Sequence, residues 1–285
     1  MNRQQETSPL GIVAGGGVMP ALVRDAAQRD GRSVFMIGIK GEAEPIAGLE
    51  TFFRIDQIGH VVKSLRQNNC REVVIIGNVT RPNLLKMRPD AGGMKVLSRV
   101  LTARRNKTIG DDVLLSHIAD YFAENDLQII APESVLADLA APAGLLTRHA
   151  PDEIAEGDIQ RGILVTRQIG ELDIGQGSVV CRGQVLGVEG PEGTDAMLAR
   201  VGGLPEVLRG TDAQRCGVLV KLPKPEQERR IDLPTLGITT IENAAAAGLA
   251  GIVFQSGGAL IVDVNACISA ANRHGLFLKG LDAEQ

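Results

Sequence analysis

The chain has 285 residues, of which 44% are hydrophobic and 22% charged, and its formal net charge is -4 at pH 7. This composition is typical of a folded, soluble protein with one large domain or two ordinary ones. Aromatic residues supply only 2% of the chain, with one Tyr and no Trp, so a stacking surface for single-stranded nucleic acid is not expected. The net negative charge gives no general attraction to DNA or RNA, and we expect no nucleic-acid partner.

The cysteines and the N-terminus indicate a cellular compartment. Cys70, Cys181, Cys216 and Cys267 lie far apart, with no C-x-x-C pair, which favours reduced cytoplasmic thiols over a disulfide framework or a zinc site. The start, MNRQQETSPLGIVAGGG, has no apolar stretch long enough for a signal peptide. No run approaches the ~20 apolar residues of a membrane span. We expect a cytoplasmic protein, and a peripheral contact with a membrane stays open.

The first predicted elements are a strand, a glycine turn and a helix. The apolar run Leu10–Ala14 is followed by Gly15, Gly16 and Gly17, and then by an amphipathic segment, Met19–Arg29. Glycines at such a turn let the backbone approach a ligand closely, and a helix start offers free N–H groups to an anion. The alternative is a tight turn without a ligand, because the segment is neither G-x-G-x-x-G nor a P-loop.

A later apolar run, Val73–Ile76, leads directly into polar residues. Its continuous apolar character predicts a buried strand, and Asn78 and Arg81 follow it closely. In open α/β sheets, ligands lie beyond the carboxyl ends of the strands, so Asn78 and Arg81 are candidate ligand-binding residues. The planar guanidinium of Arg81 suits a phosphate, and a plain surface arginine before Pro82 is the alternative interpretation.

The remaining elements of the first half complete a three-layer domain. Asp111 and Asp112 stand at the start of a helix that ends at Phe122, where they complement the helix dipole or hold a magnesium ion near phosphates. The other predicted elements here are strands at Ser33–Ile39 and Leu127–Ile130 and helices at Gln57–Asn68 and Met94–Arg104. The pattern predicts a Rossmann-like α/β domain with a parallel sheet over residues 1–139.

Proline and glycine mark the boundary between the two halves of the chain. Pro142, Gly144 and Pro151 predict a linker over residues 140–153. A second domain of the α/β or α+β class is expected over residues 154–285. Its predicted elements are a helix at Ile154–Leu172, hairpin arms at Val179–Cys181 and Val185–Val188, a strand at Cys216–Val220, a helix at Thr239–Ala247, strands at Gly251–Phe254 and Leu260–Val262, and a helix at Asn265–Arg273.

Three carboxylates gather where the second hairpin arm ends. Glu189, Glu192 and Asp195 precede or begin a predicted helix, and Thr194 or Asp195 can cap its first turn. The alternative interpretation is a well-capped turn at a solvent-exposed edge, without a functional role. The scattered histidines and the absence of G-x-S-x-G give no support to a Ser–His hydrolase or a histidine-rich metal site. The carboxylates are therefore the side chains that lie close enough together in the sequence to supply several metal ligands.

A polar segment stiffened by proline follows the strand predicted at Cys216–Val220. It carries Lys221, Lys224 and Gln227, and Asp232 follows shortly afterwards. Pro223 and Pro225 limit the freedom of the backbone, which favours a fixed arrangement of these side chains. A solvated charged loop is the alternative.

Several short motifs now point to one family. They are AGGGVMP (14–20), GNVTRP (77–82), GDD (110–112), LDIGQGSVV (172–180), EGTDAML (192–198) and KPEQERRIDLPTLG (224–237). In their order and spacing they resemble the LpxI-type UDP-2,3-diacylglucosamine pyrophosphatases of lipid A biosynthesis. The resemblance extends over essentially the whole chain.

The resemblance implies a two-domain cytoplasmic enzyme, a homodimer, with residues 154–285 as the catalytic domain. It implies a divalent metal, Mg²⁺ or Mn²⁺, and cleavage of a lipid-linked UDP-sugar, UDP-2,3-diacylglucosamine, into UMP and 2,3-diacylglucosamine 1-phosphate. Such a substrate would bring the protein to the cytoplasmic face of the inner membrane. The family's catalytic aspartate lies in an R-x-D-x-P-x-x-G segment, which this chain matches with Arg230, Asp232, Pro234 and Gly237.

Residue chemistry extends the candidate site beyond Asp232, which would activate water or ligate the metal. The candidate substrate-binding residues are Gly15, Gly16, Gly17, Asn78, Arg81, Gln176, Thr194, Lys221, Lys224 and Gln227. The candidate metal ligands are Asp111, Asp112, Glu189, Glu192 and Asp195. Two rival functions remain: a non-catalytic nucleotide-sugar binding or regulatory module, and a dinucleotide-dependent oxidoreductase. The missing G-x-G-x-x-G counts against the oxidoreductase.

Overall fold

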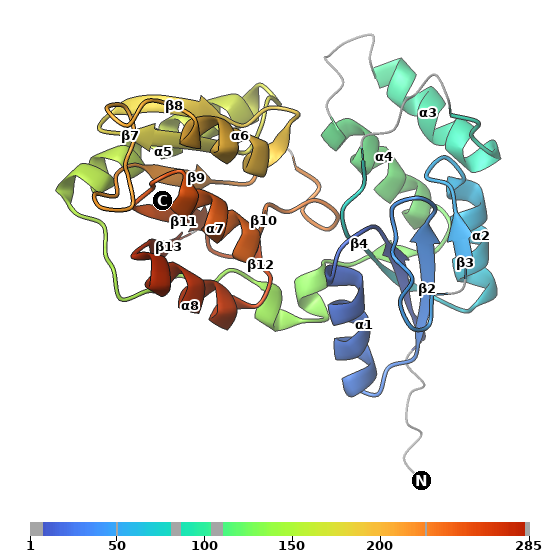
Figure 1. Cartoon of the computed structure of the whole chain (residues 1–285). Helices are drawn as coiled ribbons and strands as arrows, with labels where there is room; N and C mark the ends of the chain where they lie inside the picture. The colour runs from blue at the N-terminus through green and yellow to red at the C-terminus, as the bar shows by residue number, and fades with distance from the viewer. Residues whose placement is uncertain (1–7, 50, 81–86, 104–110, 226, 283–285) are drawn as a thin grey trace. The chain divides into compact units, whose positions relative to one another are not determined.

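A computed structural model describes residues 8–49, 51–80, 87–103, 111–225 and 227–282. The chain divides into two compact units, each an α/β arrangement (Figure 1). Unit 1 is Met1–Ala137 with Glu228–Asp232, and unit 2 is Asp138–Gln227 with Leu233–Gln285. Within the described ranges, no helix combines the length and the hydropathy that a membrane crossing requires. The predicted α/β class with two domains is confirmed.

Unit 1 contains a five-stranded sheet in which all strands are parallel. The strands are β1 (Leu10–Ala14), β2 (Val34–Ile39), β3 (Thr51–Phe53), β4 (Glu72–Ile76) and β5 (Gln128–Ile129). Their order is β3-β2-β1-β4-β5, so the sheet grows outwards in both directions from β1 and β4. This order is that of doubly wound folds, in which ligands bind beyond the carboxyl ends of the strands, where the order reverses.

Helices cover this sheet and enclose an aliphatic core. They are α1 (Met19–Arg29), α2 (Ile58–Gln67), α3 (Ala91–Ala103) and α4 (Asp111–Ala123). One core cluster joins Val13 and Ile37 of the sheet to Leu65 of α2 and Phe122 of α4, with Ile231 packed against it. Helix α1 packs against β1 and β2, and α3 packs against α2 and α4. The Rossmann-like arrangement expected for the first domain is therefore present.

Unit 2 is built on a mixed sheet of six strands. These are β6 (Gly144–Leu145), β7 (Gly177–Cys181), β8 (Gln184–Val188), β9 (Val218–Lys221), β11 (Gly251–Gln255) and β13 (Phe277–Leu281). The order is β6-β13-β11-β9-β7-β8; the three middle strands β13, β11 and β9 are parallel, and the outer strands pair antiparallel. Two short strands, β10 (Thr235–Leu236) and β12 (Leu260–Ile261), form a separate parallel pair.

Two apolar clusters hold helices against this sheet. The helices are α5 (Glu153–Glu171), α6 (Gly193–Gly202), α7 (Ile238–Ala246) and α8 (Val264–His274). Ile159 and Ile163 of α5 pack with Val218 of β9 in one cluster. Residues of α6, α7 and α8 form another, which includes Met197 and Phe254. Of the two classes left open for the second domain, the structure shows α/β with a mixed sheet.

The structure differs from the predicted division at residues 140–153, which belong to unit 2. Strand β6 lies in this stretch and pairs antiparallel with β13, and the Ala141 amide donates to the Ala259 carbonyl at 3.0 Å. Pro142 lies close against Gly280, where no Cβ could fit. The prolines and glycines therefore mark an edge strand and its turns, and the stretch that the sequence predicts as a linker between domains forms part of unit 2.

Other differences concern short or interrupted strands. The sequence pattern does not predict β3, β6 and β10, which have two or three residues each, or β13, in which lysine and glycine interrupt the apolar run. The predicted hairpin is present as β7 and β8. Its loop is Arg182 and Gly183, with φ angles of 51° and 74°, as in the two-residue turns that suit the twist of a hairpin.

Candidate active site

The loops after β1 and β4 meet at the carboxyl edge of the unit 1 sheet. The Gly16 amide donates to the Asn78 carbonyl at 2.7 Å, and the Asn78 amide donates to the Gly16 carbonyl at 2.9 Å. An added Cβ on Gly15 would lie 2.5 Å from the Asn78 carbonyl oxygen, and one on Gly77 would lie 2.8 Å from the Gly15 carbonyl carbon. Loop packing therefore requires glycine at Gly15 and Gly77. The structure brings together Gly15, Gly16, Gly17 and Asn78, as predicted.

A third loop joins the same edge through Glu42, a residue that sequence reasoning did not single out. The amide and the hydroxyl of Thr80 each donate to Glu42 Oε2 at 3.0 Å. The Glu42 carbonyl oxygen also lies 2.9 Å from the place of a Cβ on Gly16. The loops that follow β1, β2 and β4 thus form one connected rim. Arg81, predicted to bind phosphate, lies outside the described residues.

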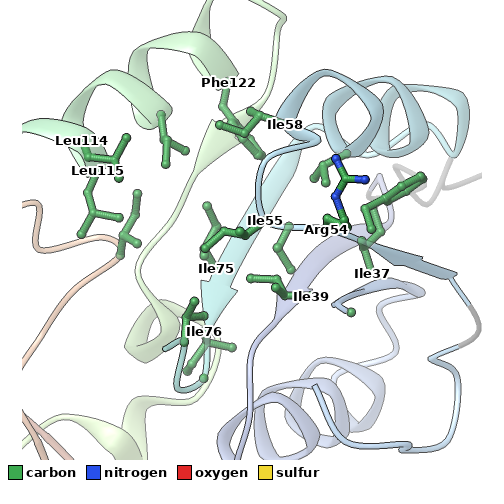
Figure 2. A pocket seen from close by; sticks show the side chains of 18 of the residues that line it. Ile37, Ile39, Arg54, Ile55, Ile58, Ile75, Ile76, Leu114, Leu115 and Phe122 are labelled. Atoms are coloured by element: carbon green, nitrogen blue, oxygen red, sulfur yellow. The ribbon is translucent and has the colours of Figure 1, made fainter. Parts of the chain in front are cut away.

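A pocket of about 360 Å³ lies in unit 1 between the sheet and helices α2 and α4. Figure 2 shows isoleucines of β2 and β4, with Leu114 and Leu115 of α4, around this space. The lining residues are mainly aliphatic: Val13, Ile37, Ile39, Phe53, Ile55, Ile58, Val61, Ile75, Ile76, Val79, Met87, Leu114, Leu115, Ile118, Phe122 and Ile231, joined by Gly38, Gly77, Arg54, Thr80 and Asp232. Its volume is within the range of small-molecule sites, about 300–1,000 Å³.

Asp232 reaches this pocket from the segment Glu228–Asp232, which is part of unit 1. The amides of Ile231 and Asp232 both donate to the Glu228 carbonyl at 2.9 Å, which closes a tight turn. Ile231 is packed against the unit 1 core, and Asp232 is half-buried. The carboxylate is therefore held at the pocket by a short turn with an apolar anchor beside it.

An ion pair within the same turn fixes its charged side chains. Arg230 Nε and Nη2 donate to the two carboxylate oxygens of Glu228 at 2.8 Å and 2.6 Å. The hydrogen bonds from Arg230 lower the pKa of Glu228, and the same bonds raise the pKa of Arg230. Both side chains stay charged near neutral pH.

Unit 2 brings together four of the predicted substrate-binding residues near the end of β9. Lys221 ends the strand, is 5% exposed, and directs Nζ to the Thr235 carbonyl at 3.4 Å. The Lys224 amide donates to Gln227 Oε1 at 3.0 Å, and Gln227 Nε2 donates to Gln176 Oε1 at 3.2 Å. The Leu222 amide donates to the Gln176 carbonyl at 3.0 Å, which ties the two segments together.

Lys224 also has an acidic partner that sequence reasoning missed. Its Nζ donates to Asp173 Oδ1 at 2.6 Å, and the lysine side chain is only 13% exposed. Asp173 has a φ angle of 53°, in the left-handed region that aspartate and asparagine tolerate. The pair holds the ammonium group of Lys224 beside the turn after α5.

Glu189 and Thr194 are buried polar side chains in unit 2. Their exposed fractions are 6% and 7%, and within the described residues Glu189 Oε2 and Thr194 Oγ1 have no hydrogen-bond partner. A Cβ on Gly177 would lie 2.5 Å from Glu189 Oε2, so the carboxylate occupies a slot that glycine leaves open. A buried polar atom without a partner is costly, so Glu189 Oε2 is suited to accept a hydrogen bond from a ligand, and the Thr194 hydroxyl is suited to accept or donate one.

The other two carboxylates of this passage engage separate partners. Arg200 Nη2 donates to Glu192 Oε1 at 3.3 Å, and Asn243 Nδ2 donates to Asp195 Oδ1 at 3.1 Å. Helix α6 begins at Gly193 after Glu192, with no side-chain capping bond. The predicted cap at Thr194 or Asp195 is therefore wrong, because both residues already lie in the first turn.

The described residues contain no group of three or more His, Cys, Asp or Glu side chains that could hold a metal ion. Glu189, Glu192 and Asp195 thus do not form such a group. Asp111 and Asp112 begin α4, but their side chains lie outside the described residues. A metal in the described part of the site would draw on fewer protein carboxylates.

Comparison with known proteins identifies the relatives of the chain. A model of the LpxI N-terminal domain matches residues 9–139, and a model of the LpxI C-terminal domain matches residues 142–279. The UDP-2,3-diacylglucosamine pyrophosphatase LpxI of Caulobacter vibrioides is 43% identical over 280 residues, which cover 97% of this chain and 98% of that protein. The chain belongs to the LpxI family. The resemblance inferred from the motifs is confirmed.

In this LpxI-family chain the described candidate residues are divided between the two units. Unit 1 contains Gly15, Gly16, Gly17, Asn78 and Asp232, and unit 2 contains Gln176, Glu189, Glu192, Thr194, Asp195, Lys221, Lys224 and Gln227. The residues that sequence reasoning missed are Glu42, Asp173 and the apolar pocket lining. Family membership also favours a hydrolase over the rival dinucleotide-dependent oxidoreductase.

Proposed function

We propose that this chain hydrolyses the pyrophosphate bond of UDP-2,3-diacylglucosamine, a step of lipid A biosynthesis, with a divalent metal and with Asp232 as its catalytic carboxylate. The products would be UMP and 2,3-diacylglucosamine 1-phosphate. The match of both family domains and the name of the 43% identical relative support the reaction. The observation that carries the proposal for this chain is that Asp232 lines an apolar pocket of about 360 Å³.

The pocket suits the acyl part of such a substrate. Apart from Arg54, Thr80, Asp232 and two glycines, its lining consists of apolar side chains. Burial of an acyl chain there stabilises the complex by about 0.8 kcal/mol for each methylene removed from water. Asp232 then lies where the apolar part of the substrate ends and its polar part begins, so that acyl binding helps to orient the bond that is cleaved.

Asp232 would act on water or on the metal that accompanies the substrate. Its position at the end of a hydrogen-bonded turn holds the carboxylate in one place. A carboxylate held near the reacting phosphoryl group can take a proton from attacking water, which contributes about 10²–10⁴-fold to a rate. The half-buried position limits competing water around it.

The donor chemistry of the chain fits a hard divalent cation, Mg²⁺ or Mn²⁺. Mg²⁺ in phosphate sites usually takes one or two carboxylates, keeps several waters and uses substrate oxygens for the rest, so a protein cage of three carboxylates is not required. Asp232 is the carboxylate at the pocket that would hold it. When bound, the cation offsets negative charge on the phosphoryl oxygens.

Unit 2 carries polar side chains whose chemistry suits a phosphate and a nucleotide. Lys221 and Lys224 supply positive charge for a phosphate, while the unpartnered oxygens of Glu189 and Thr194 can bond hydroxyl or N–H groups of a nucleotide. From the family resemblance we further propose a homodimer that works at the cytoplasmic face of the inner membrane.

The test is direct. Purified protein is incubated with UDP-2,3-diacylglucosamine and Mg²⁺, and UMP release is measured before chelation, after chelation and after Mg²⁺ or Mn²⁺ is restored. The proposal predicts UMP that disappears with the metal and returns with it. Full turnover after thorough chelation would exclude the metal role, and tight substrate binding without UMP would support the nucleotide-sugar binding module instead.

A further inference from the structure

Cys181 and Cys216 bring their sulfur atoms to 3.0 Å from each other in unit 2, although 35 positions separate them in the chain. Cys181 ends strand β7 and is 1% exposed. Cys216 lies two residues before β9 and is partly exposed. The thiol of Cys181 donates to the sulfur of Cys216. Sequence spacing alone does not predict this pair.

The backbone holds both cysteines in place. Gly217 has a φ angle of +88°, and a Cβ at this position would lie 2.8 Å from Cβ of Cys181, so glycine lets the two segments approach. The Cys216 amide donates to the Gly248 carbonyl at 3.0 Å. The closeness of the two sulfurs is therefore built into the packing of β7 against the segment before β9.

The turn after Cys181 is anchored as well. The amides of Arg182 and Gly183 donate to the two carboxylate oxygens of Asp158 at 2.9 Å and 2.7 Å. Asp158 belongs to α5 and is only 1% exposed. The end of β7 is thus tied to a buried carboxylate, which keeps Cys181 opposite Cys216.

The two other cysteines have different surroundings. The thiols of Cys70 and Cys267 donate to backbone carbonyls, at 3.8 Å from Asn68 and 3.3 Å from Val262. Burial raises the pKa of each of them to about 11. They are buried thiols of the same chain and serve as internal controls for any chemistry at the pair.

We propose that Cys181 and Cys216 are a redox modification site, which an oxidant of the peroxide class converts reversibly into a disulfide. Cys216, the more exposed thiol, attacks the O–O bond of the peroxide, giving a sulfenic acid and one water. Cys181 then attacks the Cys216 sulfur, which forms the S–S bond and releases a second water. The two sulfurs lose two electrons to the peroxide, and a thiol reductant reverses the step by exchange.

The geometry needs only a small adjustment for this step. A disulfide has an S–S distance of about 2.05 Å, so the sulfurs approach by about 1 Å. Burial, followed by the nearby Cys216, raises the pKa of Cys181 to about 12, so Cys181 rests as a thiol and the exposed partner meets the oxidant first. Cys216 is therefore oxidised before Cys181, because it is the more exposed of the two thiols.

The disulfide would close a loop that contains β8, α6 and the passage with Glu189 and Thr194. Closing a loop of this length restricts the unfolded chain and stabilises the folded one. Oxidation would therefore make unit 2 more resistant to unfolding. This inference does not depend on the proposed hydrolysis, because it concerns two thiols outside the described candidate groups.

The test treats the reduced full-length protein with a small excess of hydrogen peroxide under native conditions. Peptide mass mapping is expected to show a linked Cys181–Cys216 peptide that has lost two hydrogens and that dithiothreitol restores. The melting temperature is expected to rise by at least about 5 °C on oxidation. Cys216→Ser should abolish both effects, whereas the matched control Cys267→Ser should keep both.

Three results would overturn the proposal. One is Cys181 still present as a free thiol after Cys216 has been oxidised to a sulfinic acid. Another is a Cys216–Cys216 link between two molecules in place of the internal link. The third is a Cys216→Ser protein whose melting temperature rises with peroxide as much as that of the natural chain.

Discussion

Arg230 donates two hydrogen bonds to the carboxylate of Glu228, at 2.8 Å and 2.6 Å, in the turn that carries Asp232. The carbonyl of the same glutamate accepts the Asp232 amide at 2.9 Å. Glu228 therefore stabilises the turn through both its side chain and its backbone carbonyl. We infer that this residue positions Asp232 at the pocket without touching the reacting atoms.

Glu228→Gln tests this positioning role. The substitution keeps the shape of the side chain but removes the charge that matches Arg230. We expect kcat to fall on the order of tenfold, because small displacements of a catalytic group are costly. The melting temperature should fall only slightly, because the Arg230 side chain of this pair is 47% exposed and ion pairs open to solvent are worth about 0–1 kcal/mol.

Arg230→Lys is the matched variant, since it keeps the positive charge but loses the planar fork. Like Glu228→Gln, it should lower kcat. Wild-type kcat in both variants, or a loss that only follows melting temperature, would remove Glu228 from the positioning of Asp232.

The same pair predicts a pH dependence of stability. The hydrogen bonds from Arg230 lower the pKa of Glu228 from its usual value of 4.5 in the folded protein. A depressed folded pKa means that the stabilisation is complete above the unfolded pKa and is lost as pH falls through the folded one. Urea unfolding of the wild type and of Glu228→Gln at pH 7 to 3 measures this. Their free energies of unfolding should converge at acid pH; a difference that stays constant or grows would contradict the prediction.

Filling the pocket should weaken binding of long acyl chains. Leu115 lies on α4 and lines the pocket, so Leu115→Trp reduces its volume. We expect KM for the diacylated substrate to rise roughly tenfold, since the loss of a few buried methylenes costs about 1–3 kcal/mol. A short-chain analogue should be affected much less. Leu101→Trp, at a position on α3 that is 50% exposed, is the control and should behave as wild type.

The loop contact between β1 and β4 predicts unequal effects at two glycines with similar backbone angles. Gly77 has φ +108° and a Cβ there would lie 2.8 Å from the Gly15 carbonyl carbon, whereas Gly41 has φ +91° and nothing within 4 Å. Gly41→Ala should cost about 1–2 kcal/mol in free energy of unfolding, from backbone strain alone. Gly77→Ala should cost at least about 2 kcal/mol more, or prevent folding. Denaturant unfolding measures both free energies. Equal losses in the two variants would mean that the loops around Gly77 move aside for the added methyl group, and would contradict the prediction.

Local pattern was enough to predict the glycine turn and the hairpin. Gly15–Gly17 follow a five-residue apolar run, and Arg182 with Gly183 separates two apolar arms, so each signal lies within a few residues. The stretch 140–153 shows the limit of such signals, because proline and glycine occur in edge strands as well as in linkers.

The candidate site depended on longer-range packing. Ile58 and Leu115 have the spacing of ordinary core residues on their helices, and only the packing of α2 and α4 on the sheet leaves a space beside them. Asp195 is close to Glu189 in sequence, but its place in the first turn of α6 directs it to Asn243. The placement of Asp232 in unit 1 likewise comes from tertiary contacts and not from its neighbours in the chain.

The proposed catalytic role of Asp232 is tested by kcat of Asp232→Asn, measured together with the melting temperature and the substrate affinity of the same variant. If Asp232 is catalytic, the Asp232→Asn protein folds and binds substrate nearly as the wild type does, and its kcat is lower by roughly 10²-fold or more. Asp126→Asn, at an 86% exposed side chain of unit 1, is the control and should keep full activity. A stable, substrate-binding Asp232→Asn protein with near wild-type kcat would exclude Asp232 from catalysis.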